Sequence, residues 1–351
     1  MSGGHKIGVV VADDSFLMRK LLVDLLHSDP DIKVIGEAKD GVAAVEMVVA
    51  KHPDVVLMDY HMPIMDGAAA TEKILRGPGP LPAIIIFSAY TREGADATFR
   101  CMRAGAVDYI LKPSGELSLD LDKVREQIIS RIKEVSHATV RRLHPSRVKE
   151  RKKVRLTGAE PRKVIVIGAS TGGPPLIEEI LSELPAHYSN VILVAQHMPK
   201  FFTQSFAARL NGLTDIFVKE AESGEPIKSG EVLIIPGGIH IKVEQRKVGG
   251  GGDVFKLTKD DKEDGIFPSI DLLMSSVAQA YGDRVVGVLL SGMGTDGLEG
   301  MRAIKRCGGH TIAQDPKTAV VSSMPGAVIE NNLADEILTP KQIAQKIIKL
   351  G

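Results

Sequence analysis

Short apolar runs in the first third of the chain end in side chains that could bind a metal ion and a phosphoryl group. Clustered carboxylates repel one another unless a hard cation lies among them, and Mg²⁺ accepts a few protein oxygens together with water and phosphate. A lysine and a hydroxyl nearby would bind an incoming phosphoryl oxygen. The side chains at these run ends are Asp13, Asp14, Asp59, Ser88 and Lys112.

A plainer interpretation is available for the first pair, because Asp13 and Asp14 could simply cap the helix that follows them. Taken alone, the pair would favour that interpretation. Four apolar runs end in suitable side chains, however, and parallel sheets place their ligand sites at the carboxyl ends of strands. The agreement among the run ends therefore favours a shared site over a helix cap.

The elements that position these side chains alternate between two kinds of pattern. Amphipathic stretches such as Phe16–His27 and Val42–Ala50 separate short segments rich in Val and Ile. Such alternation predicts β–α units and a parallel, doubly wound sheet. The expected strands are Ile7–Ala12, Ile32–Glu37, Val55–Met58, Ala83–Phe87 and Val107–Leu111.

This block resembles the response-regulator receiver domain, on the residues Asp13-Asp14, the stretch Val55–Gly67, Ser88-Ala89 and Tyr109–Pro113. The resemblance implies a flavodoxin-like fold and a phosphoryl group accepted by Asp59 from a histidine kinase. It also implies that Mg²⁺, needed for phosphorylation, is held by Asp13, Asp14, Asp59 and the carbonyl of His61. It further implies a set of switch residues, which would rearrange when Asp59 is phosphorylated: Ser88, Tyr109 and Lys112.

A second candidate site begins at Ser170, in a Gly-rich turn between an expected strand, Lys163–Ile167, and an expected helix, Leu176–Leu184. The turn allows three interpretations. It could be a phosphate loop of the dinucleotide-binding kind, a nucleophile elbow because it matches G-x-S-x-G, or a tight turn built from small residues. The segment alone does not decide among them.

The next expected strand, Val191–Ala195, distinguishes the first two interpretations. A dinucleotide site calls for an acidic residue at the end of that strand, where it would bind the ribose hydroxyls. The chain instead places Gln196 and His197 there. A histidine at the strand end beside that of Ser170 favours a nucleophile–base pair.

A third member for this pair is Asp296, in another Gly-rich turn after the expected strand Arg284–Leu290. Its alternative role is the N-cap of the following helix, Leu298–Cys307. In company with Ser170 and His197, the geometric roles favour a catalytic triad in which Asp296 orients the imidazole. The chain order is Ser, His, Asp, whereas α/β-hydrolases follow the order Ser, Asp, His.

This order and its motifs resemble the catalytic domain of the chemotaxis protein-glutamate methylesterases, the CheB family. The resemblance implies hydrolysis of glutamyl methyl esters, and deamidation of glutamines, on chemotaxis receptors, with a chemotaxis histidine kinase as phosphodonor and no cofactor in the catalytic domain. It also implies that the backbone amide of Met293, with that of His197, forms the oxyanion hole, while Thr171 neighbours the site. The matching stretches are Gly168–Gly173, Gln196–Pro199, Ile235–His240, Pro268–Asp271, Leu290–Gly297 and Ala313–Asp315.

We therefore expect an α/β chain of two doubly wound parallel-sheet domains. Residues 1–136 form the receiver, residues 137–160 a basic linker, and residues 161–351 the methylesterase domain. An added β-hairpin is expected from the alternating stretches Ile239–Lys247 and Asp253–Thr258, which flank four glycines. Residues 123–163 carry 14 Lys and Arg against 4 Asp and Glu, and both flanking blocks are acidic on balance.

Composition restricts the class of protein. The formal net charge is zero, which disfavours nucleic acid as a partner. Two distant cysteines, Cys101 and Cys307, suit a reducing compartment, and neither a signal peptide nor a membrane-spanning run is visible. We expect a cytoplasmic enzyme without membrane insertion. The rival hypothesis is a phospho-switched binding module whose catalytic-like domain is inactive.

Overall fold

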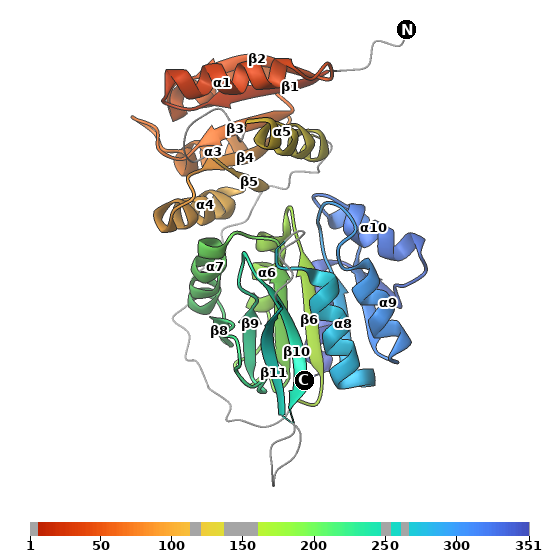
Figure 1. Cartoon of the computed structure of the whole chain (residues 1–351). Coiled ribbons are helices and arrows are strands. Elements are labelled where there is room, and N and C mark those ends of the chain that lie inside the picture. Colours follow the sequence, from red (N-terminus) through yellow and green to blue (C-terminus); the bar gives the residue numbers. More distant parts are fainter. Residues whose placement is uncertain (1–5, 113–120, 137–160, 247–253, 261–266, 351) are drawn as a thin grey trace. The chain divides into compact units, whose positions relative to one another are not determined.

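The computed structural model describes residues 6–112, 121–136, 161–246, 254–260 and 267–350. The chain divides into two units, residues 1–146 and 147–351, which are red to yellow and green to blue in Figure 1. Each unit is described by itself. The expected basic linker, residues 137–160, lies outside the described residues.

The first unit is built on a parallel sheet of five strands in the order β2-β1-β3-β4-β5. This is the flavodoxin-like order, and its ligands bind where the strand order reverses, between β1 and β3. Strands β3 and β4 are buried along their whole length, as expected for a parallel sheet covered on both faces. The strands are β1 (Ile7–Ala12), β2 (Ile32–Ala38), β3 (Val55–Asp59), β4 (Ala83–Ser88) and β5 (Asp108–Leu111).

The helices of this unit are fixed mainly at their first turns. Ser15, Asp40, Asp66 and Thr91 each precede a helix and accept a backbone N–H from its first turn. Helix α1 packs against α5, and α3 packs against both α2 and α4. The helices are α1 (Phe16–His27), α2 (Gly41–Lys51), α3 (Gly67–Arg76), α4 (Arg92–Ala104) and α5 (Leu121–Val135).

The second unit contains a parallel sheet of seven strands in the order β14-β13-β12-β6-β7-β9-β8. The chain starts at β6, proceeds through β7 toward one edge, and then returns to β12 on the other side of β6. The carboxyl ends of β6 and β12 therefore flank a switch point. The strands are β6 (Val164–Ala169), β7 (Val191–Gln196), β8 (Phe217–Glu220), β9 (Glu231–Ile234), β12 (Val285–Leu289), β13 (His310–Gln314) and β14 (Glu336–Leu338).

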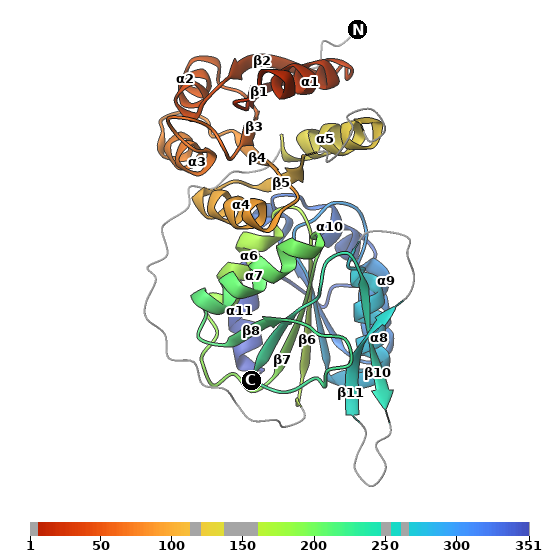
Figure 2. The same ribbon diagram turned by 60° about the vertical axis from the view of Figure 1, so that its left-hand side comes forward.

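Helices cover both faces of this sheet (Figure 2). Helices α6 (Gly173–Ser182), α7 (Lys200–Leu213) and α11 (Pro340–Lys349) lie on one face, and α8 (Ile270–Tyr281) and α9 (Leu298–Arg306) lie on the other. Helix α10 (Ser323–Glu330) packs against α9 and β13. Single 3₁₀ turns precede β12 and α10, at Gly282–Arg284 and Pro316–Thr318.

The expected β-hairpin is present as the antiparallel pair β10 (His240–Arg246) and β11 (Val254–Asp260). Strand β10 packs against α8. The prediction of two parallel α/β domains with an added hairpin is confirmed.

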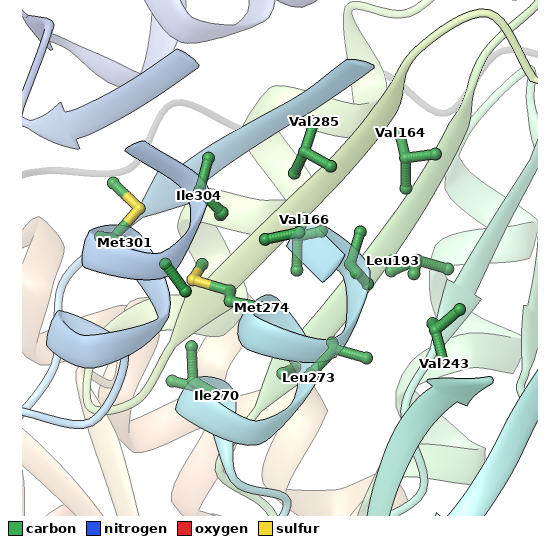
Figure 3. Packing of buried hydrophobic residues seen from close by; sticks show 14 of the residues in the cluster. Val164, Val166, Leu193, Val243, Ile270, Leu273, Met274, Val285, Met301 and Ile304 are labelled. Carbon is green, nitrogen blue, oxygen red and sulfur yellow. The ribbon is translucent and has the colours of Figure 1, made fainter. Parts of the chain in front are cut away.

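One part of the core of the second unit lies between the sheet and helices α8 and α9 (Figure 3). Val164 and Val166 point to this face because residues two apart on a strand share a face. They meet Leu273 and Met274 of α8, all fully buried. Each such side chain contributes roughly 1.5–3 kcal/mol on burial. This packing holds α8 against the sheet and fixes where its first turn begins, beside the candidate active site.

Candidate active site

Ser170 is the first residue after β6, and three hydrogen bonds hold its backbone. Its N–H donates to the carbonyl oxygen of Ser291 at 3.0 Å. Its own carbonyl oxygen accepts from Gly173 N–H and from Gln196 Nε2, each at 2.9 Å. The residue is buried, with 5% of its surface exposed. The backbone around the nucleophile is therefore held by the start of α6, the end of β7 and the turn after β12.

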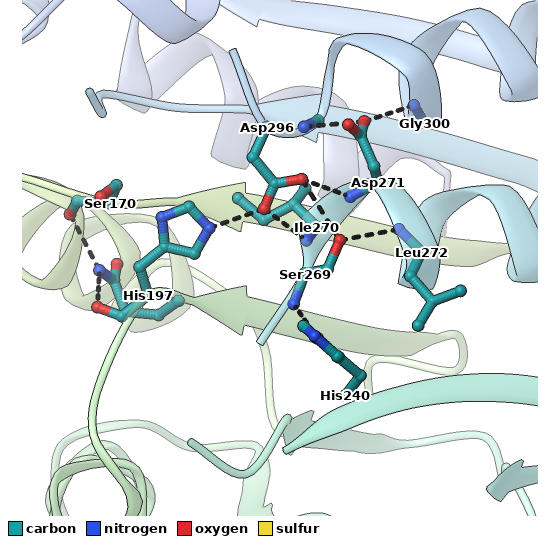
Figure 4. A network of polar contacts seen from close by, with 11 residues as sticks. Ser170, His197, His240, Ser269, Ile270, Asp271, Leu272, Asp296 and Gly300 are labelled. Carbon is teal, nitrogen blue, oxygen red and sulfur yellow. Dashed lines mark hydrogen bonds and ion pairs between the residues drawn. The ribbon is translucent and has the colours of Figure 1, made fainter. Parts of the chain in front are cut away.

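His197, directly after β7, lies between Ser170 and Asp296 (Figure 4). Its Nε2 lies 2.8 Å from Asp296 Oδ2, and its Nδ1 lies on the side of Ser170. Among the described residues, no hydrogen bond joins the Ser170 hydroxyl to the imidazole. The structure thus brings the three predicted residues to one edge of the sheet, with one of the two expected contacts formed.

The Asp296 carboxylate is held by backbone donors as well as by the imidazole. Oδ2 also accepts the N–H of Ile270 at 2.9 Å, and Oδ1 accepts that of Asp271 at 2.9 Å. Burial by itself raises the pKa of Asp296, but the hydrogen bond and charge of His197 and these N–H groups outweigh it and hold the pKa below 3.8. Asp296 is therefore an anion at neutral pH.

The alternative role of Asp296, as the N-cap of its own helix, is wrong. Gly297 occupies the N-cap of α9, with φ at +101° and no side-chain cap. The Asp296 side chain turns instead to the first turn of α8, a segment 25 residues earlier in the chain. Asp296 thus joins the imidazole to the start of a packed helix.

Two backbone N–H groups, of His197 and Met293, are the expected oxyanion donors. The N–H of His197 already donates to the carbonyl of Ala169 at 3.0 Å, so the expectation that it serves the oxyanion hole is wrong. Met293 lies half-buried in the turn after β12, and Thr171 is buried beside Ser170, where its carbonyl accepts the Ser291 hydroxyl at 2.7 Å. Met293 and Thr171 stay predictions as site neighbours.

The phosphate-loop interpretation of the Ser170 turn meets a chemical obstacle at the start of α6. Such sites bind phosphate through the unpaired N–H groups of the first helical turn. Here Pro174 and Pro175 have no N–H, and the N–H of Gly173 donates to Ser170. The first turn therefore offers few donors to an anion, and the prediction of a nucleophile remains.

Glycine is required in these turns because the loops approach one another closely. A Cβ on Gly292 would lie 2.7 Å from Ser170 Cβ and 2.1 Å from Met324 Sδ. Gly172 has φ at +74°, and a Cβ there would lie 2.6 Å from Val320 Cβ. The close approach brings the turn after β12 against the nucleophile.

In the first unit, the predicted acidic cluster forms around a lysine. Lys112 Nζ lies 2.8 Å from Asp13 Oδ2 and 2.9 Å from Asp59 Oδ1. One carboxylate oxygen from each of Asp13, Asp14 and Asp59 lies within 4.8 Å of the others. Asp14, Asp59, His61, Ser88 and Lys112 line a single pocket.

The three carboxylates of this cluster repel one another, and the charge of Lys112 does not neutralise all of them. Burial raises the pKa of Asp59 and outweighs the charge and hydrogen bond of Lys112, which lower it, while the charge of Asp13 adds a smaller rise. Burial by itself lowers the pKa of Lys112, but its bonds to Asp13 and Asp59 outweigh this and raise it. A donor set of crowded carboxylate oxygens, with Asp14 exposed to water, fits Mg²⁺ and would lose its mutual repulsion on binding it.

The cap interpretation of the first acidic pair is wrong. Ser15, not Asp13 or Asp14, is the N-cap of α1 and accepts the N–H of Met18. Asp13 Oδ1 accepts the N–H of Ser15 at 2.9 Å, which fixes the carboxylate at the end of β1.

Ser88 and Tyr109, the expected switch residues, differ in their surroundings. The buried hydroxyl of Ser88 donates to the carbonyl of Gly94 at 3.1 Å and accepts from Thr98 Oγ1 at 2.8 Å, so it is bound to the first turns of α4. Tyr109 is half-buried on β5 and is not among the residues that line the pocket, within the described chain. Burial raises the pKa of its phenol.

Known families match both units. A family model described as CheB methylesterase matches residues 165–347, and one described as response regulator receiver domain matches residues 9–121. This chain belongs to the CheB methylesterase family. Among curated CheB relatives, the protein-glutamate methylesterase/protein-glutamine glutaminase of Pyrococcus abyssi is 42% identical over 99% of this chain and 94% of its own length. A second such enzyme, from Carboxydothermus hydrogenoformans, is 43% identical over 98% and 99%.

A solved structure supports the same assignment for the second unit. The crystal structure of the Thermotoga maritima CheB methylesterase catalytic domain is 41% identical in sequence and matches with a TM-score of 0.50. The match covers 54% of this chain and 98% of that domain. In the part of this CheB family member that the structure describes, no helix is long and apolar enough to cross a membrane.

Three polar groups of the site carried no predicted role. The hydroxyl of Ser269 lies 3.4 Å from Asp296 Oδ1, and its N–H donates to His240 Nδ1 at 3.1 Å. The His240 ring stacks on Phe267, with centroids 4.4 Å apart. The side chain of Gln196 bridges the carbonyls of Ser170 and His197. A Ser before a helical pattern signals an N-cap, but nothing in the sequence pairs it with an acid 27 residues later.

Proposed function

We propose that this chain is a phosphorylation-activated hydrolase that removes methyl esters from glutamyl side chains of chemotaxis receptors and deamidates receptor glutamines. The observation that carries the proposal is the 2.8 Å contact between His197 Nε2 and the anionic Asp296, at the strand end beside Ser170. The relatives named protein-glutamate methylesterase/protein-glutamine glutaminase support the substrate class. The cytoplasmic parts of such receptors would place the enzyme in the cytoplasm.

The proposed acyl transfer follows from the tautomer of His197. The Asp296 carboxylate can only accept a hydrogen bond, so Nε2 carries the hydrogen and donates it to Oδ2, and Nδ1 presents its lone pair on the side of Ser170. Nδ1 takes the Ser170 proton as Oγ attacks the ester carbonyl, and then returns it to the departing methoxide as methanol. In the second half of the cycle, Nδ1 takes a proton from water as the water attacks the acyl-enzyme. The proton then passes to the departing Ser170 Oγ, and the product is glutamate.

Asp296 supports this cycle in two ways. Its negative charge stabilises the imidazolium that forms when Nδ1 is protonated, and its bond to Nε2 fixes the ring orientation. A glutamine side chain would follow the same course with ammonia as the leaving group. The backbone amide of Met293 is the proposed oxyanion donor, and a donor of this kind is worth about 2.7–4 kcal/mol in other enzymes.

In the receiver, Asp59 is the proposed phosphoacceptor, with a chemotaxis histidine kinase as phosphodonor. Asp13, Asp14, Asp59 and the carbonyl of His61 are the proposed ligands of Mg²⁺, which when bound would neutralise charge on the transferring phosphoryl group. Lys112 would then bind a phosphoryl oxygen. Ser88 would exchange its bonds to α4 for one to the phosphoryl group, and this exchange, with Tyr109, is the proposed switch.

The test measures methanol release from a receptor cytoplasmic fragment that carries glutamyl methyl esters. The full chain is compared with Ser170→Ala, each with and without Mg²⁺ and a small phosphodonor. We expect release that rises with phosphodonor and is lost in Ser170→Ala. Methanol release that does not change with the phosphodonor would support the esterase activity and contradict its activation by phosphorylation. A chain phosphorylated on Asp59 that releases no methanol would instead be a phospho-switched binding module.

A further inference from the structure

In the second unit, two acidic residues at the starts of α8 and α9 each bind the start of the other helix (Figure 4). Asp296, just before α9, accepts the N–H groups of Ile270 and Asp271 in the first turn of α8. Asp271, in that first turn of α8, accepts the N–H of Gly297 at 2.9 Å and of Gly300 at 2.7 Å, both at the start of α9. The two carboxylates therefore form a reciprocal pair of helix caps.

The need for this second carboxylate comes from the sequence at the start of α9. Gly297 is the N-cap and has no side chain to satisfy the N–H groups of the first turn. The helices also approach closely here, since a Cβ on Gly300 would lie 2.5 Å from Met274 Cβ and 3.3 Å from Asp271 Cα. One oxygen of Asp271 thus supplies the cap from across the helix interface.

We propose that Asp271 is a positioning residue for the esterase reaction, because it fixes the backbone at Gly297 and so aims the adjacent carboxylate of Asp296 at His197 Nε2. The inference rests on the proposed function. Among the described residues, no hydrogen bond joins Asp271 to the imidazole or to Ser170, so its effect on them passes through Asp296.

The energetics of the pair agree with a functional role. Burial raises the pKa of Asp271 to about 6 against the pull of the Gly300 N–H, and the charge of Asp296 adds to the rise. Two neighbouring carboxylates repel each other, which costs folding free energy. A neutral side chain with one acceptor oxygen could cap α9 without that repulsion. Natural proteins tend to keep such costs at functional sites.

The experiment compares Asp271→Ala and Asp271→Asn in the full chain, far below the Tm of each variant. Asparagine keeps an Oδ1 acceptor for both N–H groups, whereas alanine removes it. Two readouts are measured: kcat and KM for methanol release from the methylated receptor fragment, and the downfield proton resonance of His197 Nε2–H. A His197→Gln variant assigns that resonance.

A matched control is Asp335→Ala. Its carboxylate also accepts a backbone N–H, from Thr311 at 2.9 Å, but at the opposite end of the sheet from Ser170. This control reports what the loss of a structural carboxylate does to kcat when the triad is not affected. Should Asp271→Ala not fold, Asp271→Leu, which has the same number and branching of side-chain heavy atoms as aspartate but no acceptor, replaces it.

We expect Asp271→Ala to lower kcat by about 10- to 100-fold, the loss typical of a small misplacement of a catalytic group, with KM unchanged and the Nε2–H resonance lost. Asp271→Asn restores both readouts, and Asp335→Ala keeps them. The proposal is overturned if Asp271→Ala retains the resonance and the kcat of the unmodified chain, or if Asp271→Asn loses as much as Asp271→Ala. Because the resonance requires no turnover, its result stands apart from any failure of the esterase proposal.

Discussion

At the scale of single residues, the orientation of His197 sets the chemistry of the site. In the familiar serine-protease arrangement, Nδ1–H faces the aspartate and Nε2 faces the serine. Here Nε2 faces Asp296 at 2.8 Å, which leaves Nδ1 for Ser170. The base is therefore the ring nitrogen nearer the backbone, so small movements of the chain after β7 would act directly on the reacting proton.

Replacing the charge of Asp296 tests this assignment. Asp296→Asn removes the negative charge that stabilises the imidazolium, and in either orientation its amide NH₂ meets a backbone N–H, of Ile270 or of Asp271, that the carboxylate accepts. We expect kcat to fall by roughly 10⁴-fold, as for the equivalent change in a serine protease. The kcat of methanol release at pH 7 measures the effect. A loss below ten-fold would contradict the role of Asp296.

The Asp59 carboxyl makes a prediction about stability and pH. Its pKa is raised in the folded chain by burial, so the folded state binds its proton more tightly than the unfolded state does. Stability is therefore lost as pH rises from 3.8 through the folded pKa. Asp59→Asn removes this cost, and we expect a receiver Tm higher by a few degrees at pH 7 in the absence of Mg²⁺.

Calorimetry across a pH series checks that expectation. The Tm difference between Asp59→Asn and the unmodified chain should narrow as pH falls through the folded pKa and below 3.8, where the carboxyl becomes protonated in both states. Mg²⁺ should raise the Tm of the unmodified chain and not that of Asp59→Asn, because a bound cation stabilises only the state that binds it. A difference independent of pH would point to packing instead of charge.

At the scale of elements, the loops after β6 and β12 function as a closely packed pair. Gly292 lies against Ser170, and its missing side chain is what permits the contact. We expect Gly292→Ala to destabilise the second unit by about 1–3 kcal/mol through overpacking, and to reduce activity because Ser170 must move. Urea denaturation and methanol release measure the two effects.

Gly326→Ala is the control for this change. Gly326 lies inside α10, and nothing lies within 4 Å of where its Cβ would be. Alanine there should stabilise the helix by up to about 1 kcal/mol with activity unchanged. If both variants behaved alike, the close approach at Gly292 would not matter.

Much of the element order was predictable from the sequence. Ile7–Ala12 and Phe16–His27 match the observed β1 and α1 to the residue, because the apolar pattern marks both elements and Ser15 caps the start of α1. Ser170, His197 and Asp296 were found because parallel strands end at one edge. Helix α6 begins at Gly173, before the predicted Leu176, because Pro174 and Pro175 fit a first turn.

The reciprocal caps and the Gln196 bridge were not predictable, because they join residues distant in the chain. Local pattern shows that Asp296 precedes a helix, and the local inference is that it caps that helix. Which helix it binds depends on how α8 packs against α9. The expectation for the His197 N–H, which the resemblance implied, was wrong because the partner of this N–H is set by the β6–β7 register.

At the scale of the whole molecule, a phosphoacceptor unit and a hydrolytic unit share one chain. Under the proposed function, the unphosphorylated receiver restrains the esterase. Deleting residues 1–136 should therefore raise the methanol release seen without phosphodonor, by about 5- to 150-fold for a typical coupling free energy. Asp59→Asn in the full chain should keep the low rate even with phosphodonor. An unchanged or lower rate after the deletion would contradict the restraint.

The wide separation of the triad along the chain has a consequence for folding kinetics. His197 and Asp296 are 99 residues apart, and Ser291 and Thr171, which join the loops after β12 and β6, are 120 apart. Such contacts form only after large segments have been brought together, whereas helices form early from local contacts. In refolding from urea, esterase activity should thus return more slowly than helical circular dichroism. The rate at which esterase activity returns would then measure the last step of sheet assembly.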